Sequence, residues 1–74
     1  MSILPVLTAR AIMQKLARGD FRFIYAKGSH HYFQHPITRR MTSVPMHSGK
    51  SIGRGLLNKI IKQAGLSVKD FTKL

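Results

Sequence analysis

Apolar residues recur at the helical period near the start of the chain. Ile12 and Leu16 share one face of such a helix, while cationic and amide side chains point elsewhere. The preceding Thr8 has a hydroxyl that can accept from the free amides of a first turn, as an N-cap does. Gly19 is expected to supply the left-handed residue that ends the helix. The pattern therefore predicts a first helix over residues 9–18.

A second helical pattern lies near the end of the chain. Its apolar stripe consists of Leu56, Leu57, Ile60, Ile61 and Ala64. The helix is expected to begin within residues 51–55, where two glycines disfavour the first turn, and to end at Gly65. Ser67 followed by Asp70 has the form of an N-cap with an acid three places on, which predicts one further turn over residues 67–72.

The segment between the helices alternates instead of following the helical period. Phe21, Phe23 and Tyr25 recur at every second position in an aromatic and β-branched run, which predicts a strand with these three rings on one side.

A second strand is predicted over residues 29–35, after a tight turn at Lys27 and Gly28. Period two puts His30 on one face of this strand and Phe33 on the other. Phe33 is the better core anchor, so we expect Phe33 to point inward and His30 to point outward.

Residues 40–44 form a third predicted strand, and Pro45 is expected to mark its exposed end. The order α-β-β-β-α offers two apolar helix stripes to one sheet. We therefore predict an α+β fold in which both helices cover one face of a three-stranded antiparallel sheet, as in the double-stranded-RNA-binding-domain architecture. One domain is expected over residues 1–74, with residues 1–7 as a loosely ordered arm.

The charge and composition of the chain limit the classes of partner and of reaction that fit it. There are 13 Lys and Arg residues against 2 Asp and Glu, a formal net charge of +11, which favours nucleic acid or an acidic protein as partner. Asp20 and Asp70 are too few for a two-metal nuclease or a glycosidase carboxylate pair. Cysteine is absent, which excludes a thiolate zinc site. We expect any catalysis to be metal-free, to need no cofactor and to depend on histidine.

No apolar run approaches the roughly 18 residues that span a bilayer. The apolar opening is short and lacks the charged first part of a signal peptide. These features predict a cytoplasmic protein without a membrane partner.

Adjacent histidines, His30 and His31, follow the Gly-Ser turn, and the unperturbed pKa of histidine suits proton transfer near neutrality. RNA carries its own nucleophile, the 2′-hydroxyl, so one or two histidines with nearby cations suffice for cleavage. Binding without cleavage, in which His30 and Tyr32 stack on RNA or hydrogen-bond to it, explains the same residues. For His31 or His35 taken alone, a half-buried position bonded to a backbone carbonyl is the simpler interpretation.

Other chemistries have less support. A Ser-His-Asp triad would need one of the two acids, and adjacent strand histidines point to opposite faces and do not readily share a metal ion. The residues expected to bind RNA are Lys27, Ser29, Tyr32, Lys50 and Arg54.

Three segments of the chain resemble the HicA family of toxins. They are residues 27–36 (KGSHHYFQHP), 44–50 (VPMHSGK) and 53–67 (GRGLLNKIIKQAGLS), and residues 7–10 (LTAR) resemble the family's start. The resemblance covers nearly the whole chain in the right order. Residues 20–26 depart from it, because family members often have a Gly-Phe pair and a more polar strand there.

The resemblance implies a bacterial mRNA interferase, a small RNase of double-stranded-RNA-binding-domain-like fold that cleaves mRNA and blocks translation. A HicB-type antitoxin would bind it and cover its active site. His30 matches the catalytic histidine of the family, while His31 and His47 match positions with a possible accessory part. The alternatives are a non-catalytic basic RNA-binding domain and an interaction protein whose basic surface serves only a partner.

Overall fold

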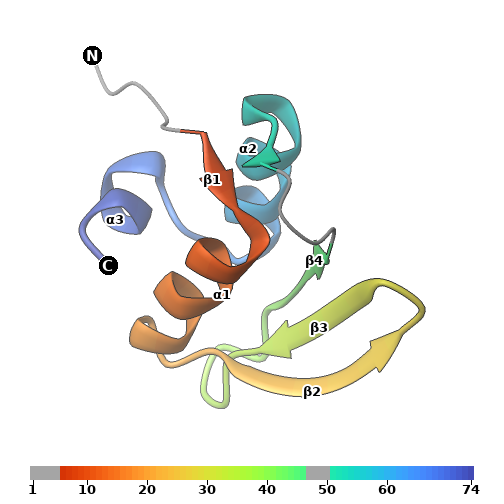
Figure 1. Cartoon of the computed structure of the whole chain (residues 1–74). Coiled ribbons are helices and arrows are strands. Elements are labelled where there is room, and N and C mark those ends of the chain that lie inside the picture. The colour runs from red at the N-terminus through yellow and green to blue at the C-terminus, as the bar shows by residue number, and fades with distance from the viewer. Residues whose placement is uncertain (1–5, 47–50) are drawn as a thin grey trace.

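The computed structural model describes residues 6–46 and 51–74 (Figure 1). In chain order its elements are β1 (Leu7–Thr8), α1 (Ala9–Arg18), β2 (Arg22–Lys27), β3 (His30–Gln34), β4 (Met41–Pro45), β5 (Ser51–Ile52), α2 (Arg54–Gln63) and α3 (Val68–Thr72). The predicted α-β-β-β-α order and α+β class are confirmed. The two short strands β1 and β5 were not predicted.

A three-stranded antiparallel sheet is formed by β2, β3 and β4 in that order. Phe33 lies opposite Thr42 and His31 lies opposite Val44, so these four side chains share one face of the sheet. Buried residues of α1 and α2 pack with Phe33 and Val44 in one cluster. Both helices therefore cover the same sheet face, as predicted, and the opposite face is left open.

The core joins this covered sheet face to all three helices. Its buried apolar members are Ala9, Ile12, Leu16, Phe21, Phe33, Val44, Ile52, Leu57, Ile60, Ile61, Ala64 and Phe71. Thr42 is also buried, and its hydroxyl lies 3.1 Å from the Ile60 carbonyl oxygen and 3.2 Å from Gln63 Oε1. The single hydroxyl proton is donated to one of them at a time, which ties β4 to α2.

Both bounds of α1 follow the sequence prediction, but the conformation of the residue after it does not. The Ala11 N–H donates to Thr8 Oγ1 at 3.2 Å, which confirms the N-cap. Gly19 has a φ of −85°, so its predicted left-handed conformation is wrong. The left-handed residue is Asp20, with a φ of 70°. An aspartate tolerates that conformation because its short polar side chain can bond locally.

The buried face of α2 is narrower than the apolar stripe in its sequence predicts. Leu57, Ile60 and Ile61 are buried, whereas Leu56 is 43% exposed. Successive helical residues are about 100° apart, so a sheet that covers Leu57 leaves Leu56 at the margin. Gly65 has a φ of 75°, which confirms the expected left-handed residue after this helix.

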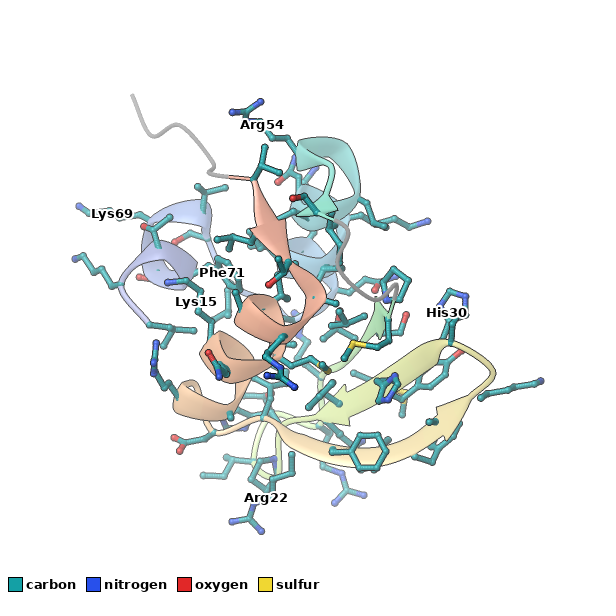
Figure 2. All side chains as sticks on the ribbon, viewed as in Figure 1. Lys15, Arg22, His30, Arg54, Lys69 and Phe71 are labelled. Atoms are coloured by element: carbon teal, nitrogen blue, oxygen red, sulfur yellow. The ribbon has the colours of Figure 1, made fainter. Side chains whose placement is uncertain are left out.

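The short helix α3 is capped and anchored as its sequence predicts. The Asp70 N–H donates to Ser67 Oγ at 3.0 Å. Phe71 is fully buried, and the Lys15 ammonium of α1 lies 5.6 Å from the centre of its ring (Figure 2). Lys15 Nζ also donates to the Leu74 carbonyl oxygen at 2.9 Å, which fastens the end of the chain to α1.

Two strand predictions need correction. The register of β2 against β3 shifts between Phe23 and Tyr25, so these rings do not lie on one face as the alternation predicts. A bulge inserts one extra residue, here Ile24, and reverses the alternation beyond it. Pro45 is the last residue of β4, as predicted, but it is buried opposite His30 and not exposed as expected.

The predicted arm over residues 1–7 falls largely outside the described residues. Leu7 belongs to β1, which pairs antiparallel with β5, so Leu7 lies opposite Ile52. Because the pair is antiparallel, α1 follows Thr8 at one end of it and α2 follows Ile52 at the opposite end. None of the helices in the described part of the chain is long and apolar enough to cross a membrane.

Candidate functional site

The open sheet face carries three of the residues that the sequence marks for function, namely Lys27, His30 and Tyr32. Its members, by cross-strand register, are Arg22, Tyr25 and Lys27 of β2, His30, Tyr32 and Gln34 of β3, and Met41, Ser43 and Pro45 of β4. Below, "open face" means these residues.

His30 is the first residue of β3 and lies on the open face at the tip of the β2–β3 hairpin (Figure 2). It is exposed, and it lies opposite Lys27 on one side and opposite Pro45 on the other. The turn before it places Gly28 at a φ of 60°, a conformation that glycine adopts at little cost. The predicted outward orientation of His30 and inward orientation of Phe33 are confirmed.

The hairpin tip is held to the end of β4 by a backbone hydrogen bond. The Met46 N–H donates to the Ser29 carbonyl oxygen at 2.6 Å. This bond fixes the chain just before His30 against the third strand, so the histidine is presented from a defined backbone position.

Two tyrosines stack on the same face, two residues along β3 from His30. The rings of Tyr25 and Tyr32 have centroids 4.6 Å apart and planes inclined by 11°. Tyr25 is 47% exposed, so the outer ring of the stack is open to a ligand. The sequence marked Tyr32 and missed Tyr25, because the bulge that brings Tyr25 to this face leaves no signal in the alternation.

A shallow pocket of about 280 Å³ borders the stack. It is lined by Tyr32, Met41, Thr42, Ser43 and Gln63, so it reaches from the open face around the β4 edge to the end of α2. The hydroxyl of Ser43 and the amide of Gln63 give this pocket groups that can both donate and accept hydrogen bonds. Gln63 and Ser43 were not marked by the sequence.

His31 lies on the face opposite His30 and has a different environment. Its ring is half-buried, with its centroid 5.7 Å from that of Phe23, and its Nδ1 atom is buried without a hydrogen-bond partner among the described residues. The two histidines are neighbours in the chain, but their side chains lie on opposite faces of the sheet. The structure therefore does not bring His31 to the open face.

His35, the residue after β3, has a structural role. Its Nδ1 accepts from the backbone N–H groups of Ile37 and Thr38 at 3.1 and 3.2 Å, and its ring meets the Phe21 ring edge-on at 5.3 Å. The half-buried position fits the simpler interpretation of this histidine, but its backbone partners are amides, not the expected carbonyl.

The remaining predicted residues divide into two groups. His47 and Lys50 lie outside the described residues, so their parts stay predictions. Arg54 is the first residue of α2 and lies well away from His30 (Figure 2). Among residues 6–46 and 51–74, no three His, Cys, Asp or Glu side chains gather in a way that could hold a metal ion.

The chain is similar in sequence to a known protein family. A scan against models of protein families matches residues 9–66 to the HicA toxin of bacterial toxin–antitoxin systems. A search of curated proteins finds no match to the chain. The family match spans α1, the whole sheet and α2, and it includes His30 and the stacked tyrosines. The chain therefore belongs to the HicA family of bacterial toxins.

Proposed function

We propose that this chain is a metal-independent mRNA interferase, an endoribonuclease that cleaves mRNA and so blocks translation, and that a HicB-type antitoxin neutralises it. The observation that carries the proposal is the place of His30. It is an exposed histidine on the open sheet face, beside a lysine and a stacked tyrosine pair, in a chain of the HicA toxin family.

The chemistry needs few protein groups, because RNA supplies the nucleophile. The 2′-hydroxyl oxygen attacks the adjacent phosphorus, the bond from phosphorus to the 5′-oxygen breaks, and a 2′,3′-cyclic phosphate and a 5′-hydroxyl result. His30 serves this reaction as a general base toward the 2′-hydroxyl or as a general acid toward the 5′-oxygen. We propose that Lys27, which pairs with His30 across the hairpin, offsets the negative charge that develops on the phosphorane.

The open face also offers groups that can bind the RNA substrate. Unstacked RNA bases bind aromatic rings, and the exposed Tyr25 ring extends the Tyr25–Tyr32 stack toward such a base. The pocket beside Tyr32 offers hydrogen-bonding groups to a neighbouring base or ribose. The backbone of Ser29 positions the turn from which His30 projects.

Further residues enter the proposal through the family resemblance. His47 and His31 are proposed as accessory groups, and the orientation of His31 restricts it to an indirect part. Lys50 and Arg54 are proposed to bind the RNA backbone. Arg54 would do so at a distance from the cleaved bond, because it lies apart from His30.

A non-catalytic RNA-binding domain is the second candidate function. The exposed tyrosine stack on a basic chain favours it, since stacking and charge bind single-stranded RNA whether or not a bond is cut.

Analysis of the cleavage products tests the proposal. The purified chain, incubated with single-stranded RNA in excess EDTA, should give products ending in 2′,3′-cyclic phosphate or 3′-phosphate. Activity that is lost in EDTA and restored by a divalent ion would contradict the metal-independent mechanism. Products with a 3′-hydroxyl would identify water as the nucleophile, and RNA binding without cleavage would establish the second candidate.

A further inference from the structure

The pocket beside the tyrosine stack lies along a free edge of the sheet. β4 is an outer strand in the order β2-β3-β4, on the side away from β2. The pocket has a volume of about 280 Å³, and its lining includes Tyr32 of β3, Ser43 of β4 and Gln63 of α2. Pockets for drug-sized ligands measure roughly 300–1,000 Å³, so this one suits a single flat ring system better than a longer stretch of polymer.

The strand register turns the backbone of Ser43 toward this edge. In an antiparallel ladder, residues whose N–H and C=O groups bond to the partner strand alternate with residues whose groups point away from it. The Arg40 carbonyl oxygen accepts from the His35 N–H, and the Met46 N–H donates to the Ser29 carbonyl oxygen. Ser43 lies an odd number of positions from both Arg40 and Met46 in an unshifted register, so its N–H and C=O point away from β3.

The side chain of Gln63 is held at the same edge by a buried residue. Gln63 is exposed at the end of α2, and its Oε1 atom lies 3.2 Å from the hydroxyl oxygen of Thr42, which is only 2% exposed. This contact orients the carboxamide. It leaves the Nε2 amide group of Gln63 to donate to a ligand in the pocket.

The ring of Tyr32 forms a flat wall of the pocket. The Tyr25 and Tyr32 centroids are 4.6 Å apart, close to the roughly 4.8 Å that separates neighbouring strands, and the ring planes differ by 11°. The rings therefore stack in the direction that crosses the strands. Tyr25 covers one face of the Tyr32 ring, and the other face is turned toward Ser43, the partner of Tyr32 on β4. A base in the pocket can stack on that face.

We propose that this pocket binds one base of the RNA and selects it by its hydrogen-bonding edge, with Gln63 as the specificity-determining residue. The inference rests on the proposed function for the RNA substrate. Gln63 Nε2 donates to a carbonyl oxygen of the base, and Ser43 accepts from the ring N–H beside it. Uracil and guanine carry such a carbonyl next to a ring N–H, whereas adenine and cytosine carry an amino group next to an unprotonated ring nitrogen. The pocket therefore favours uracil or guanine.

The pocket is close to the bond that His30 is proposed to cut. Tyr32 and His30 share the open face and are about 7 Å apart along β3. A single nucleotide spans such a distance, so the selected base belongs to a nucleotide next to the cleaved bond. The pocket thus determines where the RNA is cut.

A protein strand fits this edge less well than a base does. Strand addition would use the outward N–H and C=O groups of β4, and Pro45, which has the outward register of Ser43, has no N–H to donate. An added strand would also leave the Tyr32 ring face without a stacking partner. A base uses both the ring and the polar groups of the pocket.

Cleavage of single-stranded RNA with a randomised sequence tests the inference. Sequencing of the cut ends gives the frequency of each base on both sides of the cut. Gln63→Met keeps the length of the side chain and removes its hydrogen-bonding groups, whereas Gln63→Glu replaces the Nε2 donor by an acceptor. Gln14→Met is the matched control, because Gln14 is an exposed glutamine of α1 outside the pocket.

Two further measurements accompany the sequencing. Thermal unfolding is followed for every variant. Fluorescence anisotropy in the His30→Ala background, with and without Gln63→Met, measures binding of short RNAs that differ in one base, so that binding is compared without cleavage.

We expect the wild type to favour uracil or guanine at one position next to the cut by at least about tenfold, as hydrogen bonds to a base edge allow. Gln63→Met should reduce this preference to less than about threefold. Gln63→Glu should shift it toward adenine or cytosine, and Gln14→Met should match the wild type. If Gln63→Met does not fold, Gln63→Glu carries the test, because it keeps an oxygen for Thr42.

An unchanged base profile in the Gln63 variants would overturn the inference and leave the edge to another occupant, such as a protein strand. A loss of cleavage that is equal for all four bases would also overturn it, since that is the effect of a merely structural role. Base-dependent binding that Gln63→Met abolishes, in a wild type that cuts no RNA, would refute the proposed function and support the base pocket. Binding and cleavage that are equal for all bases would refute the base pocket alone.

Discussion

His30 and His31 are adjacent in the chain and yet have different surroundings. His30 is exposed on the open face, whereas His31 is half-buried with its ring near Phe23. The cause is the alternation of side chains along a strand, which sends neighbours to opposite faces. A matched pair of substitutions can therefore separate catalysis from stability.

We expect His30→Ala to lower the rate of RNA cleavage by about 10²–10⁴-fold, the usual value of a positioned proton-transfer group. The melting temperature should barely change, because an exposed side chain adds little to the core. Single-turnover cleavage of a labelled RNA and thermal unfolding followed by circular dichroism measure the two effects.

His31→Ala is the control for this assignment. It should lower the melting temperature more than it lowers the cleavage rate, because the His31 ring contributes to packing next to Phe23. Near-wild-type cleavage by His30→Ala together with loss in His31→Ala or His47→Ala would show that another histidine is catalytic. Unfolding of His30→Ala would show that its role is structural.

Among the elements, the helices show how local signals determine helix ends. The Thr8 and Ser67 side chains accept from backbone amides of the first turns of α1 and α3. The glycines of α2 differ from one another in their effect. Gly65 lies just beyond the helix at a φ of 75°, and an added Cβ would come within 3.0 Å of Arg40 Nε. Gly55 lies inside α2, and nothing within 4 Å would meet an added Cβ.

These surroundings predict opposite effects of one substitution at the two glycines. Gly65→Ala should lower the free energy of unfolding by about 1–2 kcal/mol, because a left-handed conformation is strained for a residue with a Cβ. Gly55→Ala should raise it by about 0.5 kcal/mol, because alanine favours the helix. Urea denaturation of both variants measures the difference. Equal effects of the two substitutions would contradict this account of the helix end.

For the molecule as a whole, charge is the dominant property. Cations that lie far from His30 and off the open face, such as Arg54 and Lys69, occupy different sides of the molecule (Figure 2). The positive potential therefore surrounds the protein and is not confined to the open face. Such a field draws a polyanion from any direction, and the open face then selects how it binds.

RNA binding should accordingly weaken with salt. If about four phosphates are contacted, the logarithm of the binding constant should fall against the logarithm of the salt concentration with a slope of roughly −3 on single strands. Fluorescence anisotropy with a labelled RNA and the inactive His30→Ala variant gives this slope without cleavage. A binding constant that does not respond to salt would rule out the electrostatic contribution.

Much of this architecture can be predicted from the sequence, because helical periodicity, helix caps and tight turns depend on residues that are close together in the chain. The helix bounds, the Thr8 and Ser67 caps and the outward position of His30 are of this kind. Other features depend on contacts between segments distant in sequence, for which the sequence carries no local signal. The bulge that stacks Tyr25 on Tyr32, the pairing of β1 with β5 and the exposure of Phe23 at the sheet edge arise only when the strands assemble. Strand register is a property of two segments at once, so no single segment can encode it.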